Sequence, residues 1–177
     1  MKKLILFILA IIILYNVIGT YKQDYYVIPN EAIRIRIIPN SNTPKDQLLK
    51  KNVKTNIELD VENDLKDSKT IDESRTIIKN NISKYENTVS QVLKNENKNQ
   101  KYKVDFGYHY FPEKTYKGVK YKEGNYESLL VTLGEGKGDN WWCVLFPPIC
   151  SLEAQDTGEN DVKYSFYVKE LIEKYLK

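Results

Sequence analysis

Both cysteines and both tryptophans of the 177-residue chain fall within one short stretch, NWWCVLFPPIC, at residues 140–150. Cysteine can serve as a nucleophile, a redox group or a metal ligand, so chemistry is sought here first. Cys143 and Cys150 have neither the C-x-x-C spacing of thioredoxin-type redox sites nor a zinc-binding pattern, and no second ligand pair exists. In an oxidising compartment this spacing favours a structural disulfide, with a regulatory disulfide as the alternative.

The remaining candidate residues predict no catalytic site, no metal site and no cofactor. His109 is the only histidine, and we expect a structural or surface role because no nucleophile or orienting acid is identifiable nearby. The acidic alternation in residues 58–64 (Glu58, Asp60, Glu62 and Asp64) lacks the glycine and glutamate of an EF-hand loop and is interpreted as a solvated face. The stretch GEGKG at 134–138 departs from phosphate-binding loops and predicts a tight turn.

The beginning of the chain indicates export. Lys2 and Lys3 precede an apolar run at residues 4–14, as in a signal peptide or a short membrane anchor. We therefore predict three parts: a signal peptide or membrane anchor at 1–19, a linker at 20–30, and a single extracytoplasmic α+β domain at 31–177. The 27 basic and 24 acidic residues are interspersed and give a formal charge of only +3. This balance argues against nucleic-acid binding.

The pattern along the chain predicts a helical pair packed on a mainly antiparallel sheet. Apolar and basic residues alternate at 32–38, which is typical of a half-buried strand. Thr43 and Thr70 each begin a helix with an acidic residue in the first turn, and apolar residues continue at helical spacing as far as Leu65 and Val92. Further strands are expected at 101–110, 125–133 and 142–146, with a small hairpin at 114–121. Residues 151–161 read as a loop, and 163–176 as a strand that ends in a short helix.

The adjacent tryptophans raise the question of a binding surface. Neighbouring residues of a strand point to opposite faces, so Trp141 and Trp142 cannot both point inward from a strand. If one packs inside, the other is a candidate anchor for a partner, because tryptophan is enriched at binding hot spots. The alternative is that both are buried in a bent loop.

With these motifs in view, the chain resembles the stage II sporulation protein R family of endospore-forming bacteria. Two stretches carry the resemblance, GEGKGDNWWCVLFPPIC at 134–150 and IRIRIIPNSNTPKDQLLK at 33–50, and GNYESLLVTLGEG at 124–136 aligns in order between them. The sequence departs from the family pattern at Arg36, where histidine is common, at Pro39 and at Asn42.

The resemblance implies a signalling protein and not an enzyme. Members are made in the forespore and exported to the space between forespore and mother cell. There they trigger a membrane-embedded sporulation protease of the mother-cell membrane, which processes the precursor of sigma factor E. We expect partner contacts on two surfaces and a disulfide holding the tryptophan loop. The candidate residues are Trp141, Trp142, Asn140, Gly136 and Gly138 on the first surface, Arg34, Asn40 and Ser41 on the second, and Cys143 and Cys150 in the disulfide.

Two other functions remain open from the residues themselves. The aromatic residues could stack on sugars, which would make the chain an extracytoplasmic cell-wall glycan-binding module. The two cysteines could alternatively belong to a thiol oxidoreductase.

Overall fold

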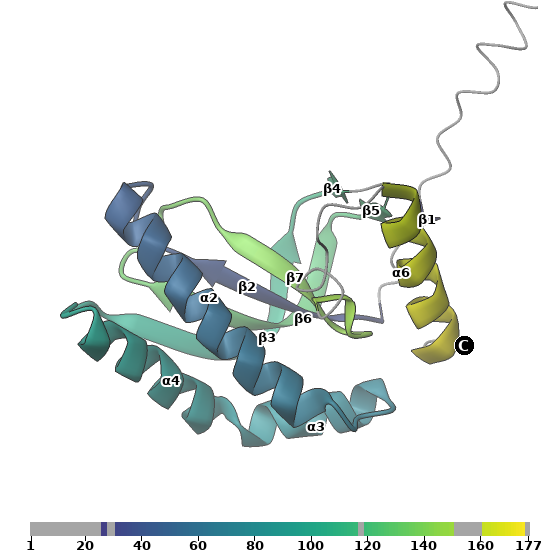
Figure 1. The fold of residues 1–177 in the computed structure, drawn as a ribbon, viewed down its shortest axis with the longest axis horizontal. Coiled ribbons are helices and arrows are strands. Elements are labelled where there is room, and N and C mark those ends of the chain that lie inside the picture. Colours follow the sequence, from purple (N-terminus) through teal and green to yellow (C-terminus); the bar gives the residue numbers. More distant parts are fainter. Residues whose placement is uncertain (1–25, 28–30, 117–118, 151–160, 176–177) are drawn as a thin grey trace, which may run out of the picture.

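The computed structural model describes residues 26–27, 31–116, 119–150 and 161–175, and the elements in these ranges form an α+β fold (Figure 1). The segment predicted as a signal peptide or anchor, 1–19, lies outside the described residues, as does most of the linker. Within the ranges described, no helix is both long and apolar enough to cross a membrane. The strands are β1 (Tyr26–Val27), β2 (Ile33–Ile38), β3 (Tyr102–Phe111), β4 (Lys114–Tyr116), β5 (Val119–Tyr121), β6 (Gly124–Leu133) and β7 (Trp141–Phe146), and the helices are α2 (Pro44–Leu65), α3 (Ile71–Asn80), α4 (Ile82–Asn95) and α6 (Asp161–Tyr175).

The main sheet has four strands in the order β3-β6-β2-β7. β3 pairs antiparallel with β6 and β2 pairs antiparallel with β7, whereas β2 and β6 run parallel. The prediction of a mainly antiparallel sheet is therefore confirmed. A second, three-stranded sheet in the order β1-β5-β4 contains the predicted hairpin.

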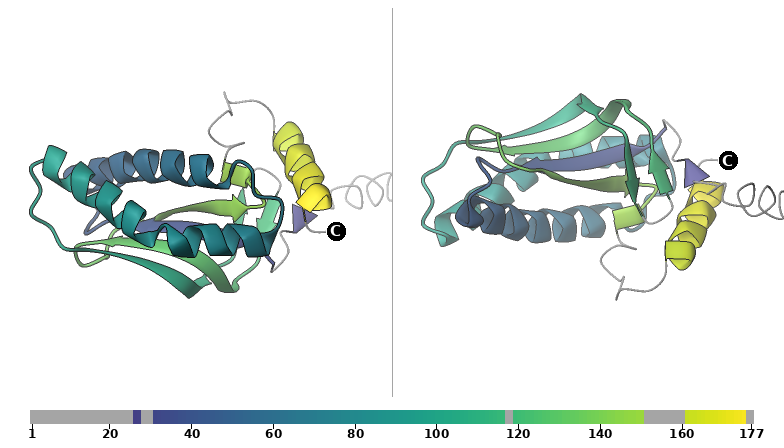
Figure 2. Two further views of the ribbon diagram at one scale, coloured as in Figure 1. Left: turned by 90° about the horizontal axis from the view of Figure 1, so that it is seen from below. Right: turned by 90° about the horizontal axis from the view of Figure 1, so that it is seen from above.

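Helices α2, α3 and α4 lie on one side of the main sheet (Figure 2). The alternation in β2 turns Ile33, Ile35 and Ile37 to this side, where all three are fully buried. They pack in one core with α2 residues such as Val53 and α4 residues such as Val89. Burying the apolar stripe of each helix against the sheet gives this layer its stability.

The two predicted helix starts are confirmed, but the second helix is not continuous. Thr43 accepts a hydrogen bond from the Asp46 amide, and Thr70 accepts one from the Glu73 amide at 3.2 Å. Asn81 separates α3 from α4, because its side-chain amide donates to the Ile77 carbonyl at 3.0 Å and competes with regular helix bonding. The sequence predicts two helices here, and the structure has three helical segments, α2, α3 and α4.

The interpretation of the acidic alternation as a solvated face was wrong for Asp60 and Asp64. Both are half-buried between α2 and α4. The Thr88 hydroxyl donates to Asp60 at 2.6 Å, and the Tyr85 hydroxyl donates to Asp64 at 3.0 Å. Residues spaced by four share one helix face, so these two carboxylates join the helices.

A second, smaller core lies on the other side of the sheet. It contains Val119 and Tyr121 of β5, Val144 of β7, and Val168 and Ile172 of α6. The prediction of a strand at the start of 163–176 was wrong, since α6 is helical from Asp161 to Tyr175. Val168 and Ile172 are one helical turn apart and both are buried, so packing outweighs the strand propensity of the aromatic residues.

Candidate functional site

The two tryptophans lie in strand β7, at the edge of the main sheet, and face opposite sides of it. Trp141 packs against the helix-side core, and the Lys54 ammonium lies 4.7 Å from its ring centroid. Trp142 packs against the second core, with its ring edge-to-face to Tyr121 at 5.0 Å and to Phe111 at 5.6 Å. Both tryptophans are half-buried, so each combines a structural role with some exposed surface.

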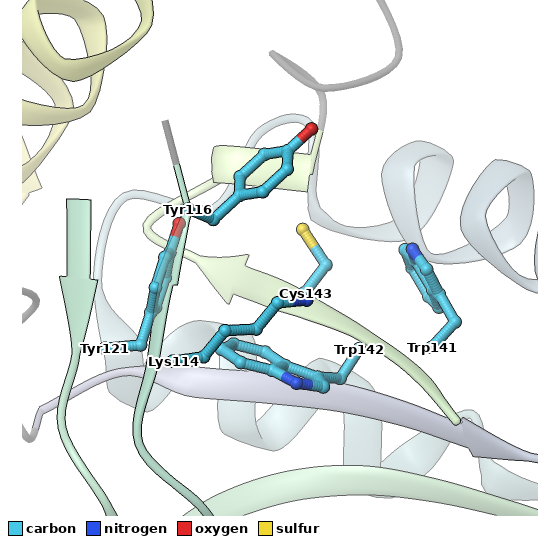
Figure 3. Close-up of a pocket in the computed structure, with 6 residues that line it drawn as sticks. All are labelled: Lys114, Tyr116, Tyr121, Trp141, Trp142 and Cys143. Carbon is cyan, nitrogen blue, oxygen red and sulfur yellow. The ribbon is translucent and has the colours of Figure 1, made fainter. Parts of the chain in front are cut away.

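A pocket of about 150 Å³ opens between β7 and the small sheet (Figure 3). Both tryptophan rings and Tyr116 border it, and the Lys114 side chain runs beside Trp142. Ligand pockets commonly hold roughly 300–1,000 Å³. This one has room for a single side chain of a partner and is small for a cofactor. Its lining residues are Lys114, Tyr116, Tyr121, Trp141, Trp142 and Cys143.

Arg34 lies fully buried beneath this pocket, in a cage of aromatic rings. Its guanidinium carbon is 3.4 Å from the ring centroid of Tyr126, 5.0 Å from that of Phe111 and 5.1 Å from that of Trp142. Its three guanidinium nitrogens have no carboxylate or backbone carbonyl partner among the described residues, and the Tyr126 side chain is the neighbour that most favours the charged form. Burial lowers the pKa of Arg34 to about 10, which leaves the guanidinium charged at neutral pH. Arg34 therefore supports the site from below and presents no surface to a partner.

The predicted second surface, Asn40 and Ser41, packs against the glycine turn. The Asn40 side-chain oxygen accepts from the Glu135 amide at 3.0 Å, and the backbone amide of Gly138 donates to the Pro39 carbonyl at 3.1 Å. A Cβ on Gly138 would lie 2.3 Å from the Ser41 carbonyl oxygen, so only glycine allows this approach. The two stretches that carry the family resemblance thus form one interlocked corner.

The polar groups of this corner are bound to each other. The Ser41 hydroxyl donates to Asp46 at 2.6 Å, and the Asn40 amide donates to the same carboxylate at 3.0 Å. These two hydrogen bonds, with Ser41 the stronger, lower the pKa of Asp46 below its ordinary value. Gly136 has φ +64° and accommodates the turn, and Asn140 is half-buried directly before β7. Asn40 and Ser41 therefore use their polar atoms in shaping the corner.

Cys143 and Cys150 form a disulfide, with their Cα atoms 5.7 Å apart. The Cys150 sulfur lies 3.0 Å from the Val144 carbonyl oxygen, and both cysteines pack against the helix-side core. The disulfide fixes the segment after β7 to the strand that carries both tryptophans.

The expectation that no hydroxyl or acid lies near His109 was wrong. Its Nδ1 is 2.8 Å from the Ser128 hydroxyl and its Nε2 is 3.1 Å from Asp105. The three residue types are those of a serine-protease triad, but the two ring nitrogens are exchanged, since in the triad Nε2 faces the serine. Ser128 is fully buried in the middle of β6, which pairs on both sides, so no substrate can reach its oxygen. The adjacent backbone amides belong to a sheet and form no oxyanion hole. The arrangement is a polar link between β3 and β6.

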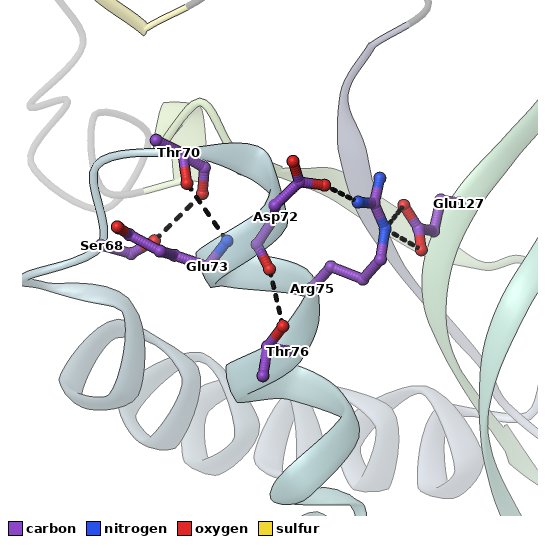
Figure 4. Close-up of polar contacts among 7 residues, drawn as sticks. All are labelled: Ser68, Thr70, Asp72, Glu73, Arg75, Thr76 and Glu127. Atoms are coloured by element: carbon purple, nitrogen blue, oxygen red, sulfur yellow. Dashed lines mark hydrogen bonds and ion pairs between the residues drawn. The ribbon is translucent and has the colours of Figure 1, made fainter.

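Sequence reasoning also missed an ion pair between α3 and the sheet (Figure 4). Arg75 Nε donates to both carboxylate oxygens of Glu127, at 2.7 and 2.8 Å, and Arg75 also contacts Asp72. Glu127 is 8% exposed, and its hydrogen bonds raise the pKa of Arg75. The two residues are 52 positions apart, so no local pattern reveals the pair. In the part of the chain that the structure describes, no three His, Cys, Asp or Glu side chains are grouped to hold a metal ion.

Comparison with known proteins agrees with these motifs. A family model described as "Stage II sporulation protein R" matches residues 29–156. The chain is also 36% identical over 163 residues to the stage II sporulation protein R of Bacillus subtilis strain 168, which covers 86% of this chain and 73% of that protein. No solved structure matches. Because the match spans both sequence motifs and most of the chain, the protein belongs to the stage II sporulation protein R family.

Proposed function

We propose that this protein is an exported sporulation signal that activates a membrane-embedded protease, which then processes the precursor of the mother-cell sigma factor E. The observation that carries the proposal is the family match over residues 29–156, which includes the interlocked corner and the tryptophan strand. The burial of Ser128 argues against a serine hydrolase built on Ser128 and His109. Export through residues 1–19 places the domain outside the cytoplasm, where it meets the protease.

An activator of this kind acts by preferential binding. It shifts the protease only to the extent that it binds the active state more tightly than the inactive one, because equal affinity for both states shifts nothing. A contact surface held in one shape loses little freedom on binding. The disulfide at β7 and the hydrogen-bonded corner provide such a surface, and Trp141 and Trp142 supply the aromatic groups suited to anchor it.

Deletion of the gene in its host tests the proposal directly. We expect the sigma factor precursor to accumulate on an immunoblot of sporulating cells, because the protease stays inactive without its activator. A plasmid copy of the full chain restores processing and serves as the control. Normal maturation of the precursor in the deletion strain contradicts the proposal.

Binding to cell-wall glycans is separated from this function by a pull-down. A lysine ammonium lies over each tryptophan ring, Lys54 over Trp141 and Lys114 over Trp142, so a sugar that stacked there would first displace a charge. We expect no retention of the exported chain on purified peptidoglycan. Strong retention, together with unaltered sigma factor processing in the deletion strain, identifies a wall-binding module.

A further inference from the structure

The pocket beside Trp142 carries positive charge that the described residues do not neutralise. The Lys114 ammonium lies 5.3 Å from the Trp142 ring centroid, and the Arg34 guanidinium carbon lies 5.1 Å from the same centroid. Neither forms an ion pair with a carboxylate in the part of the chain described. The nearby Glu113 binds Lys120 instead, at 3.0 Å. An uncompensated charge against low-dielectric aromatic walls attracts a negative group.

The same pocket lies between two strand edges. β7 ends the main sheet and β4 ends the small sheet, and neither pairs with a further described strand on its outer side. The Cys150 sulfur contacts the Val144 carbonyl oxygen of β7, and Trp142 lies two residues before this contact. An exposed strand edge accepts an extended segment of another protein through backbone hydrogen bonds, and a neighbouring pocket then selects one side chain.

We propose that this pocket receives an aspartate or glutamate side chain from an extended segment of the partner protein, with the carboxylate at Lys114 and the stem against the aromatic rings. The cavity of about 150 Å³ fits one such side chain. The identity of the partner as the protease rests on the proposed function, but the acidic chemistry of its segment rests on the charges of the pocket alone. The charge of the buried Arg34 adds to that of Lys114, so the pocket favours an acidic side chain over a neutral or basic one.

Photocrosslinking in sporulating cells tests the position of the contact. Tyr116 lines the pocket and is 39% exposed, so a photoreactive p-benzoylphenylalanine in its place in the full chain reaches a bound segment. Tyr108 of β3, at the opposite edge of the main sheet, is 73% exposed and is the matched control. We expect an adduct with the protease from position 116 and none from position 108, and the crosslinked peptide contains an acidic residue. Three results overturn the inference. They are equal adducts from both positions, a crosslinked peptide without an acidic residue, and an adduct that a muramidase removes.

Charge reversal tests the chemistry. Lys114→Glu, combined with the photoreactive residue, lowers the adduct about tenfold because it places like charges together. Lys114→Gln lowers the amount of adduct less. The control, Lys94→Glu at an exposed position of α4 outside the pocket, leaves the amount of adduct unchanged. An adduct unaffected by Lys114→Glu overturns the inference. Intact sigma factor processing in the deletion strain contradicts the proposed function. If processing is lost in that strain but the Lys114→Glu chain still forms the full amount of adduct, only the acidic-pocket inference is contradicted.

Discussion

Arg34 is the most unusual residue of this protein, because it carries a full charge into a wholly buried site with no carboxylate partner among the described residues. The faces of Phe111, Tyr126 and Trp142 attract the guanidinium and offset part of its desolvation. Cation–π contacts in dry surroundings contribute about 2 kcal/mol or more each, and burying a charge costs several kcal/mol, so the two effects are of similar size. The charge thus contributes little net stability, although the side chain fills its space well.

This balance predicts different outcomes for two substitutions of Arg34. Arg34→Met keeps most of the volume and removes the charge, so we expect the free energy of unfolding to change by no more than about 1 kcal/mol. Arg34→Ala leaves a cavity and lowers it by about 2–5 kcal/mol. Chemical denaturation of both variants checks the prediction. Equal destabilisation by the two changes means that the charge itself holds the fold together.

The polar link at His109 makes a prediction that separates structure from catalysis. Ser128→Ala removes the hydroxyl that contacts His109 Nδ1, so we expect a loss of about 1 kcal/mol in the free energy of unfolding. Processing of the sigma factor precursor in cells continues, because Ser128 does not react with a substrate. A stable Ser128→Ala chain that cannot support processing contradicts this role and makes Ser128 a functional group.

Among the elements, the turn of residues 134–138 depends on close approach to the start of α2. Gly138→Ala places a Cβ 2.3 Å from the Ser41 carbonyl oxygen, and that backbone must shift. We expect a loss of about 1–3 kcal/mol in the free energy of unfolding. Gly107→Ala in β3 is the matched control, since nothing lies within 4 Å of its added Cβ. Thermal or denaturant unfolding of both variants decides whether the corner is as tightly packed as described.

The same corner predicts a dependence of stability on pH. The hydrogen bonds from Ser41 and Asn40 lower the pKa of Asp46 in the folded chain, so its carboxylate stabilises the fold above the ordinary aspartate pKa. That contribution disappears as the pH falls through the lowered value. We therefore expect Asp46→Asn to be less stable than the wild type at about pH 6, with a smaller difference at about pH 3. A difference that does not change with pH shows that the charge of Asp46 is unimportant.

The sequence predicts those helices and strands whose patterns depend on residues close together in the chain. Alternation revealed β2, and the capping threonines revealed where α2 and α3 begin. Contacts between distant residues stayed hidden, such as Glu135 with Asn40, 95 positions apart, and Arg75 with Glu127. The tryptophans were identified by residue type, but the burial of Arg34 follows from the β4–β5 hairpin that covers it, and no local pattern specifies that packing.

The whole molecule has two hydrophobic cores that share one sheet, and the disulfide lies where β7 contributes to both. Cys143 belongs to the helix-side core, and Val144 to the second core. The two cores meet at β7, because successive residues of this strand enter different cores. The edge strand β7 is therefore packed on both of its faces.

Removing the disulfide tests its structural role. The bridge joins residues with a sequence separation of 7, and its loop-closure contribution amounts to about 2.5 kcal/mol. We expect the Cys143→Ser, Cys150→Ser chain to lose about that much in its free energy of unfolding and still to support sigma factor processing while it stays folded. A folded double variant that fails in processing indicates instead that the thiols take part in the function, as in an oxidoreductase.

The opposite orientation of the two tryptophans has a consequence for following this protein in solution. They are the only two indoles of the chain, and each borders a different core. With Phe in place of one of them, the remaining ring emits from a single side of the sheet. Trp141 alone then reports on the helix-side core, and Trp142 alone reports on the second core. The protein therefore carries two built-in optical probes, one for each of its hydrophobic cores.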